Sequence, residues 1–211
     1  MAAGPPPIAR PPTRELAFGD PCFAVNLQIR PPDDTRVRLD RLRTRMADGT
    51  GLAMQFAPAG TLHLTVFSIV YVRAVYPSGP EAVWAGLRRP VDAALQRLAG
   101  TTPPFTLDFV RAGLRGDAVL VEADPDPRLE AIRDRVAAAI AGIAPAFRAP
   151  TTHSTLARLA QPVAEPRLRP LSDCLGEQVL AWPVHELRLV VETRYPALEE
   201  SPAGRYPLTG G

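Results

Sequence analysis

Two short motifs constrain the fold of this chain more than any other feature. They are His63-Leu64-Thr65 and His153-Ser154-Thr155, and each lies in a run typical of a β-strand, residues 62–72 and 151–159. Successive side chains of a strand point to opposite faces, so the His and Thr of each motif share a face. The motifs are 90 residues apart, at 63 and 153. That separation is too long for a local metal-binding loop but natural for two halves of a repeated fold, so we expect folding to bring both pairs face to face.

Composition places the chain among soluble globular proteins. It has 211 residues, of which 46% are hydrophobic and 22% charged, so it can bury a substantial core. The net charge is +2, all 24 basic residues are arginine, and no block of like charge marks a nucleic-acid-binding tail. There is no run apolar enough for a signal peptide or a membrane span. Cys22 and Cys174 are the only cysteines, which favours a reducing compartment. We expect a cytoplasmic monomer.

The order of elements predicts two similar halves. Residues 1–20 contain five prolines and no apolar periodicity, and we predict a flexible leader there. Residues 21–211 then form a single domain of two pseudo-repeats, about 21–115 and 116–211. Each repeat reads as strand, helix, His-x-Thr strand, helix, strand.

Hydrophobic periodicity and turn residues give the expected boundaries. Besides the two motif strands, we expect strands at 21–29, 106–110, 118–123, 184–191 and 203–208. Helices are expected from Asp33-Asp34 to Asp48-Gly49, and over 81–98, 127–143 and 163–175. The predicted fold class is α+β, a bilobal arrangement with a pseudo-twofold that places both histidines in one cleft.

Two facing imidazoles can act as an acid–base pair. Histidine titrates near pH 6.5, so one ring can accept a proton while its partner carries one. Cleavage of a phosphodiester needs this combination, because one group activates the attacking oxygen and another protonates the leaving oxygen. Thr65 and Thr155, on the histidine faces, can donate hydrogen bonds to phosphate oxygens. We expect no metal and no other cofactor, because a zinc site would need more ligands than His63 and His153.

These motifs, running on as His63-Leu64-Thr65-Val66-Phe67 and His153-Ser154-Thr155-Leu156-Ala157-Arg158, resemble the paired signatures of the two-histidine (2H) phosphoesterase superfamily. The RNA 2′-5′ ligase-like and 2′,3′-cyclic phosphodiesterase branch is the most similar. The resemblance extends to segments 23–25, 56–58, 186–189 and 204–208. It implies two antiparallel sheets lining a central cleft, with helices outside.

The resemblance also implies roles for particular residues. His63 and His153 become the acid–base pair, Thr65 and Thr155 become phosphate ligands, and Arg158 becomes a further phosphate contact. Strict alternation would put Arg158 on the face opposite His153, so reaching the site would need a β-bulge or a strand end.

Two further side chains are interpreted from the residues alone. Phe67 shares the face of His63 and Thr65 under strict alternation and is a candidate to stack on a base, with a core position as the alternative. His185, the third histidine, has no Thr two residues on and is interpreted as structural.

The expected function is metal-independent hydrolysis of a 2′,3′-cyclic phosphate, or a related phosphodiester, on a nucleotide or RNA end. Three alternatives stay open: reversible 2′-5′ RNA ligation, a nucleotide-binding module without chemistry, and action on another small phosphodiester. Which histidine is the acid and which is the base is also open at this stage. No membrane partner is expected.

Overall fold

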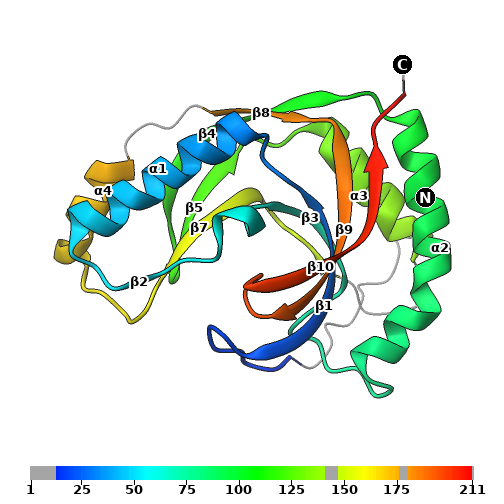
Figure 1. Ribbon diagram of the computed structural model, residues 1–211, viewed down its shortest axis with the longest axis horizontal. Coiled ribbons are helices and arrows are strands. Elements are labelled where there is room, and N and C mark those ends of the chain that lie inside the picture. The colour runs from blue at the N-terminus through cyan, green and yellow to red at the C-terminus, as the bar shows by residue number, and fades with distance from the viewer. Residues whose placement is uncertain (1–12, 141–146, 176–179, 211) are drawn as a thin grey trace, which may run out of the picture.

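A computed structural model describes residues 13–140, 147–175 and 180–210 of the chain (Figure 1). The helices in these ranges are α1 (Asp33–Thr50), α2 (Pro80–Thr101), α3 (Pro127–Ala139) and α4 (Arg169–Leu175). The strands are β1 (Pro21–Ile29), β2 (Met54–Gln55), β3 (Leu64–Val70), β4 (Phe105–Arg115), β5 (Ala118–Ala123), β6 (Phe147–Arg148), β7 (Thr152–Leu159), β8 (Leu180–Val184), β9 (Glu186–Arg194) and β10 (Glu199–Pro207).

The described strands form one curled antiparallel sheet. Its order is β10-β9-β1-β3-β7-β5-β4-β8, with β2 added beside β7 and β6 beside β3. The sheet curves into a half-barrel with the helices on its outside (Figure 1). The α+β fold with a cleft between two lobes is therefore confirmed. The two expected sheets are the two halves of this one sheet, joined at β3 and β7 by the pair Leu64–Ser154.

Each half of the sheet takes strands from both halves of the sequence. β4, which ends the first repeat, lies between β5 and β8 of the second. In return, β9 from the end of the chain pairs with β1. The helices follow the same exchange: α1 and α4 lie against β7, β8 and β4, whereas α2 and α3 lie against β1, β3 and β10 (Figure 1). The two lobes are thus interlocked through their terminal strands.

The helix boundaries follow from local capping chemistry. The Asp126 side chain accepts hydrogen bonds from the backbone N–H groups of Arg128 and Leu129, and Pro127 occupies the first position of α3, as predicted. Asp33 and Asp34 fall in the first turn of α1, where carboxylates favour the positive end of the helix. The same helix continues past the predicted stop at Asp48-Gly49 to Thr50 and is capped by Gly51, whose φ of 62° suits a residue without a Cβ.

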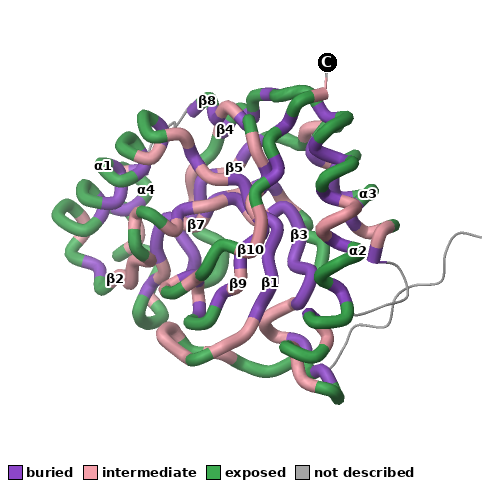
Figure 2. The backbone as a smooth tube through the Cα atoms, turned by 45° about the vertical axis from the view of Figure 1, so that its right-hand side comes forward, coloured by how far each residue is buried: buried purple, intermediate pink, exposed green. Residues whose placement is uncertain are grey.

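The hydrophobic core lies between the outer face of the sheet and the helices. Figure 2 shows buried positions along β1, β3 and β7 and exposed ones on the outward faces of the helices. Trp182 is fully buried and stacks on Phe109 with ring centroids 4.9 Å apart. This packing leaves the inner, concave face of the sheet for polar side chains. No described helix is long and apolar enough to cross a bilayer.

The predicted leader is described in part. Residues 1–12 lie outside the described residues. Residues 13–20 run along the body: Thr13 forms a β-bridge with Ala74, and the Arg14 N–H donates to the Arg73 carbonyl at 2.8 Å.

Candidate active site

A pocket on the inner face of the sheet collects both motifs. His63 immediately precedes β3 and Thr65 lies on it, whereas His153 and Thr155 lie on β7; all four side chains line the pocket. The strands that carry them are neighbours in the sheet, at the junction between its two halves. The expected meeting of the two pairs in one cleft is therefore observed.

The strand register arranges the four side chains as a square. β3 and β7 are antiparallel and Leu64 pairs with Ser154. Moving one residue along each strand from this pair, the antiparallel register places His63 opposite Thr155 and Thr65 opposite His153. Directly opposed side chains of an antiparallel pair have Cβ atoms about 5 Å apart, and diagonal ones roughly 7–8 Å. Both imidazoles therefore lie on one diagonal across the β3–β7 junction and line the same pocket.

A β-bulge follows the threonine in both strands. On β3 the register passes from Gln28–Thr65 to Leu27–Phe67, so Val66 is extra. On β7 it passes from Leu120–Thr155 to Val119–Ala157, so Leu156 is extra. An extra residue reverses the alternation beyond it. The equivalent residues three positions after each threonine, Ser68 and Arg158, consequently line the pocket.

The bulge on β3 corrects the expectation for Phe67. Strict alternation put Phe67 on the face of His63 and Thr65, but past Val66 the alternation is reversed, and Phe67 packs in the hydrophobic core at 3% exposure. Ser68 occupies the pocket position instead. Phe67 is therefore a core residue, the alternative that the sequence left open.

The bulge on β7 has the opposite effect on Arg158, which it brings onto the histidine face. One guanidinium nitrogen, Nη1, donates to both carboxylate oxygens of Asp117 at 2.9 Å. The guanidinium also lies 5.7 Å from the centre of the Tyr195 ring. Its Nε is buried and has no hydrogen-bond partner within the described parts of the chain, whereas the residue as a whole lines the pocket.

The His63 ring is held in one tautomer. Its Nδ1 lies 2.7 Å from the Thr61 carbonyl, which can only accept, so Nδ1 carries the proton. Nε2 then has a free lone pair and accepts from the Thr65 hydroxyl at 3.2 Å. Burial, with the Arg30 charge adding to it, lowers the pKa of His63 to about 4. His63 is therefore a neutral imidazole at pH 7, with its basic nitrogen directed along the Thr65 side.

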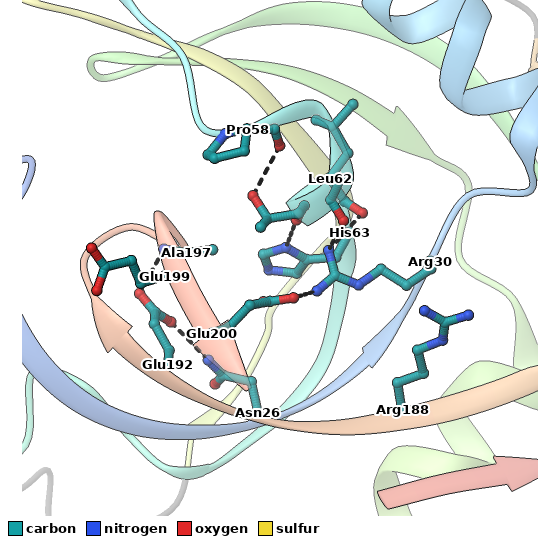
Figure 3. Close-up of polar contacts among 12 residues, drawn as sticks. Asn26, Arg30, Pro58, Leu62, His63, Arg188, Glu192, Ala197, Glu199 and Glu200 are labelled. Carbon is teal, nitrogen blue, oxygen red and sulfur yellow. Dashed lines mark hydrogen bonds and ion pairs between the residues drawn. The ribbon is translucent and has the colours of Figure 1, made fainter. Parts of the chain in front are cut away.

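Arg30 is a neighbour of this ring that sequence reasoning missed. Figure 3 shows its guanidinium beside His63, where it donates to the Leu62 carbonyl at 3.1 Å and forms an ion pair with Glu200. Burial lowers its pKa to about 10, and the nearby Arg188 acts in the same direction. Arg30 fixes the backbone that carries His63 and keeps a positive charge near the ring.

The surroundings of His153 differ in charge. Its Nδ1 lies 3.0 Å from the Thr151 hydroxyl, and the paired residue on β5 is Glu122. Burial lowers the pKa of His153, and the Arg115 and Arg133 charges act in the same direction, while the Thr151 hydrogen bond and the Glu122 carboxylate oppose the effect. The carboxylate distinguishes His153 from His63, whose charged neighbours, Arg30 and His153, only lower its pKa.

A family model for the 2′-5′ RNA ligase superfamily matches residues 31–196 of this chain. The chain belongs to that superfamily, which is the 2H phosphoesterase group expected from the two motifs. The match spans both motifs and both bulged strands.

Several solved structures share the fold of this chain. The chain is similar to E. coli LigT complexed with NADP+, at a TM-score of 0.59 and 19% identity, over 89% of this chain and 99% of LigT. LigT complexed with 3′-AMP gives the same TM-score and identity over 90% of this chain and 99% of that one. The protein TT0787 of Thermus thermophilus has a TM-score of 0.57 and 17% identity, over 89% and 98% of the two chains. A comparison with curated protein sequences gives no significant match.

In this member of the 2′-5′ RNA ligase superfamily, a second arginine missed by sequence reasoning lies behind the site. Arg133 on α3 is 1% exposed and pairs with Glu130. Its Nε donates to the carbonyl of the bulged Val66 at 3.2 Å, and its Nη2 to the Thr151 carbonyl at 3.3 Å. One side chain thus contacts the backbone of both motif strands. Its spacing, four residues after Leu129 and three before Val136, places Arg133 on the apolar stripe of the helix, and an arginine there is the signal that could have identified it.

The rest of the pocket wall comes from the edge of the sheet and the leader. It includes Phe18, Asn26, Gln55, Ala57, Thr61, Val72, Glu192, Tyr195, Pro196 and Ala197. His185 is exposed between β8 and β9, away from these residues. Among the described residues, His, Cys, Asp and Glu side chains form no group of three able to hold a metal.

Proposed function

We propose that this protein is a metal-independent phosphodiesterase that opens a 2′,3′-cyclic phosphate, or a related phosphodiester, on a nucleotide or RNA end. The observation that supports this most is the square of His63, Thr65, His153 and Thr155 across the β3–β7 junction. It offers one base, one acid and two hydroxyl donors around a single phosphorus centre. Membership of the 2′-5′ RNA ligase superfamily supports the same class of chemistry.

In the proposed mechanism His63 is the general base. Its Nδ1–H is bound by the Thr61 carbonyl, and when the Thr65 hydroxyl turns from Nε2 to the phosphate, Nε2 takes a proton from water while the water oxygen attacks phosphorus. The lowered pKa keeps this nitrogen unprotonated at neutral pH. The Arg30 charge nearby further disfavours protonation of the free ring.

His153 is the proposed general acid. The Glu122 carboxylate favours its protonated form more than the surroundings of His63 do, and an anionic phosphate in the pocket raises the pKa of both imidazoles. His153 therefore holds the proton that passes to the departing ribose oxygen as the P–O bond breaks. The product is a phosphomonoester beside a free hydroxyl.

The hydroxyls and the arginine have a shared electrostatic role in this proposal. Thr65 and Thr155 donate to the non-bridging oxygens, where charge accumulates in the transition state. The Arg158 guanidinium, which lines the pocket, adds a charge-assisted hydrogen bond to the same group. All three side chains lie on the inner face of the sheet, on the two bulged strands β3 and β7.

The test measures turnover of a panel of nucleoside 2′,3′-cyclic phosphates by wild type, His63→Ala and His153→Ala. Each substitution is expected to lower kcat by about 10²–10⁴-fold, the usual contribution of a positioned acid or base. Thermal unfolding of each variant checks that the fold persists. Full turnover in either folded variant would overturn the mechanism.

Reversible 2′-5′ RNA ligation is the second candidate, and the family name favours it. The same pair of histidines would then deprotonate a 5′-hydroxyl in place of water. Incubation with RNA halves that end in a cyclic phosphate and a 5′-hydroxyl separates joining from hydrolysis. Tight nucleotide binding with no product from either assay would instead indicate a binding module.

A further inference from the structure

The pocket continues beyond the histidines to a group of side chains at the turn between β9 and β10. This group, which we call the turn subsite, consists of Phe18, Asn26, Glu192, Tyr195 and Ala197, and all five line the pocket. None of these positions belongs to the two motifs. The turn subsite therefore contributes contacts that the proposed chemistry does not use.

Phe18 is held at the turn subsite by backbone hydrogen bonds. The N–H of Gly19 donates to the Tyr195 carbonyl at 2.7 Å, and the N–H of Tyr195 donates to the Asp20 carbonyl at 2.9 Å. The Asp20 carboxylate also accepts from the N–H of Ala17 at 2.8 Å. The residues on both sides of Phe18 are thus anchored, and its ring has a fixed place on the pocket wall.

The ring of Phe18 is available to a ligand. Its exposure is intermediate, and it is absent from the hydrophobic core and from the side chains packed against that core. No ring stacking or cation–π contact involves it within the described residues. The Tyr195 ring, in contrast, is already contacted by Arg73 and Arg158 at 5.4 and 5.7 Å. Phe18 is accordingly the aromatic surface that an occupant of the turn subsite meets.

Glu192 supplies acceptors at the same place. Glu192 is buried, with 5% of its surface exposed. Its Oε1 accepts a hydrogen bond from the N–H of Ala197 at 2.7 Å, and its Oε2 accepts one from the Asn26 side-chain amide at 3.0 Å (Figure 3). Oε2 keeps a second lone pair, and the second lone pair of Oε1 has only a long contact, 3.9 Å, with the Cys22 thiol. A buried carboxylate in a pocket for an anionic substrate repels phosphate, so the group it receives must present N–H donors.

We propose that the turn subsite binds the nucleobase of the substrate, with Phe18 stacking on the base and Glu192 accepting its N–H groups. The inference rests on the proposed function and adds a base preference to it. Guanine fits best, because its N1–H and N2–H lie side by side and match the two oxygens of a carboxylate. Adenine, cytosine and uracil lack that adjacent pair of donors.

The experiment compares kcat/KM for the four nucleoside 2′,3′-cyclic phosphates and for glycerol 1,2-cyclic phosphate, which has no base. Wild type is expected to prefer the guanosine substrate. Phe18→Ala should lower kcat/KM for all four nucleosides by about tenfold or more, since stacking of one base on an aromatic ring is of that magnitude. It should leave the base-free substrate unchanged, and Phe18→Tyr should retain most activity.

Glu192→Gln removes the carboxylate that would bind the base but keeps an oxygen that accepts from the N–H of Ala197. It therefore tests base recognition without removing the hydrogen bond that holds the turn. We expect it to lower kcat/KM for the guanosine substrate selectively. Val75→Ala is the matched control, since Val75 is an exposed apolar side chain outside the pocket. Unchanged nucleoside turnover in Phe18→Ala, or equal losses with and without a base, would overturn the subsite.

A second measurement keeps the subsite and the catalytic proposal apart. Equilibrium binding of guanosine 3′-monophosphate needs no turnover, and we expect Phe18→Ala and Glu192→Gln each to weaken it about tenfold. If wild type turned over no cyclic phosphate, the catalytic proposal would fail while this binding difference still supported the subsite. If wild type turned over the base-free and guanosine substrates equally and both variants bound normally, the subsite would fail and the catalytic proposal would stand.

Discussion

His63 and His153 occupy similar positions on their strands but have unlike neighbours. Arg30 lies beside the first ring, and Glu122 is paired with the second across β5 and β7. The motifs could be identified from sequence because each consists of three consecutive residues. The neighbours could not, because Arg30 and Glu122 belong to segments whose placement beside the motif strands is fixed only by the tertiary fold.

Removal of the Glu122 charge should change the basic limb of the pH profile. The carboxylate opposes the lowering of the His153 pKa, so Glu122→Gln lowers that pKa further. If His153 is the acid, activity is then lost at lower pH on the basic side, while the acidic limb stays in place. The measurement is kcat/KM against pH for wild type and variant.

Glu122→Asp keeps the charge and serves as the control for that profile. A shift of the acidic limb instead of the basic one would reverse the assignment of acid and base. A uniform fall in activity at every pH would indicate that Glu122 acts on structure alone.

The half-buried imidazole of His63 should also make stability sensitive to acid. The pKa of His63 is about 4 in the folded protein against an ordinary value near 6.5, so the unfolded chain binds the proton more readily. Stability is therefore fully present above pH 6.5 and falls as the pH decreases toward 4, by roughly 3 kcal/mol for this group. Urea unfolding between pH 7 and 4 measures the slope, and His63→Gln should flatten it.

At the scale of single elements, the strands were predictable but the bulges were not. Alternation of apolar and polar residues located β1, β3, β7 and β9, because one face of each is buried. Val66 and Leu156 are ordinary strand residues, and nothing in their local sequence marks an extra position. Strict alternation therefore assigns Phe67 to the wrong face, and Arg158 reaches the pocket only through the bulge that the sequence reading required.

Arg133 should be needed to keep the bulge on β3 in place. It donates to the carbonyls of Val66 and Thr151, so Arg133→Met leaves two buried acceptors and Glu130 without this partner. We expect a loss of about 3 kcal/mol in the free energy of unfolding, because each buried acceptor left without a hydrogen bond costs roughly 1–3 kcal/mol. Equilibrium denaturation measures the loss, and kcat should fall more than KM rises.

Arg135→Met on the same helix is the matched control, because Arg135 is exposed on α3. It should change neither stability nor kcat appreciably. Equal stability of the two variants would show that the Arg133 hydrogen bonds contribute little to the site.

At the scale of the whole molecule, the two-lobed arrangement followed from the repeated order of elements, but the exchange of strands did not. Hydrophobic periodicity identifies a strand but does not indicate which other strand it pairs with. β4 could equally have closed the first lobe; instead it pairs with β5 through the tight turn at Gly116, whose φ is 61°, and with β8 beyond it. Long-range pairing of this kind is decided by the completed core.

Division of the chain at the β4–β5 turn should therefore give two fragments that do not fold alone. Residues 1–116 lack the partners of β4 and the strand β9 beside β1, and residues 117–211 lack β1, β3 and β4. Neither fragment should show a cooperative thermal transition, whereas co-expression should restore turnover. A cooperative transition in either fragment alone would contradict the interlocked arrangement.

The pairing of β1 with β9 has a consequence for synthesis. β1 pairs with β3 on one edge, but the strand on its other edge, β9, is made only after residues 30–185. During synthesis one edge of β1 therefore stays unpaired until β9 has left the ribosome. Chains that stop before Glu186 should lack this pairing, together with the part of the pocket wall that Glu192 and Tyr195 form.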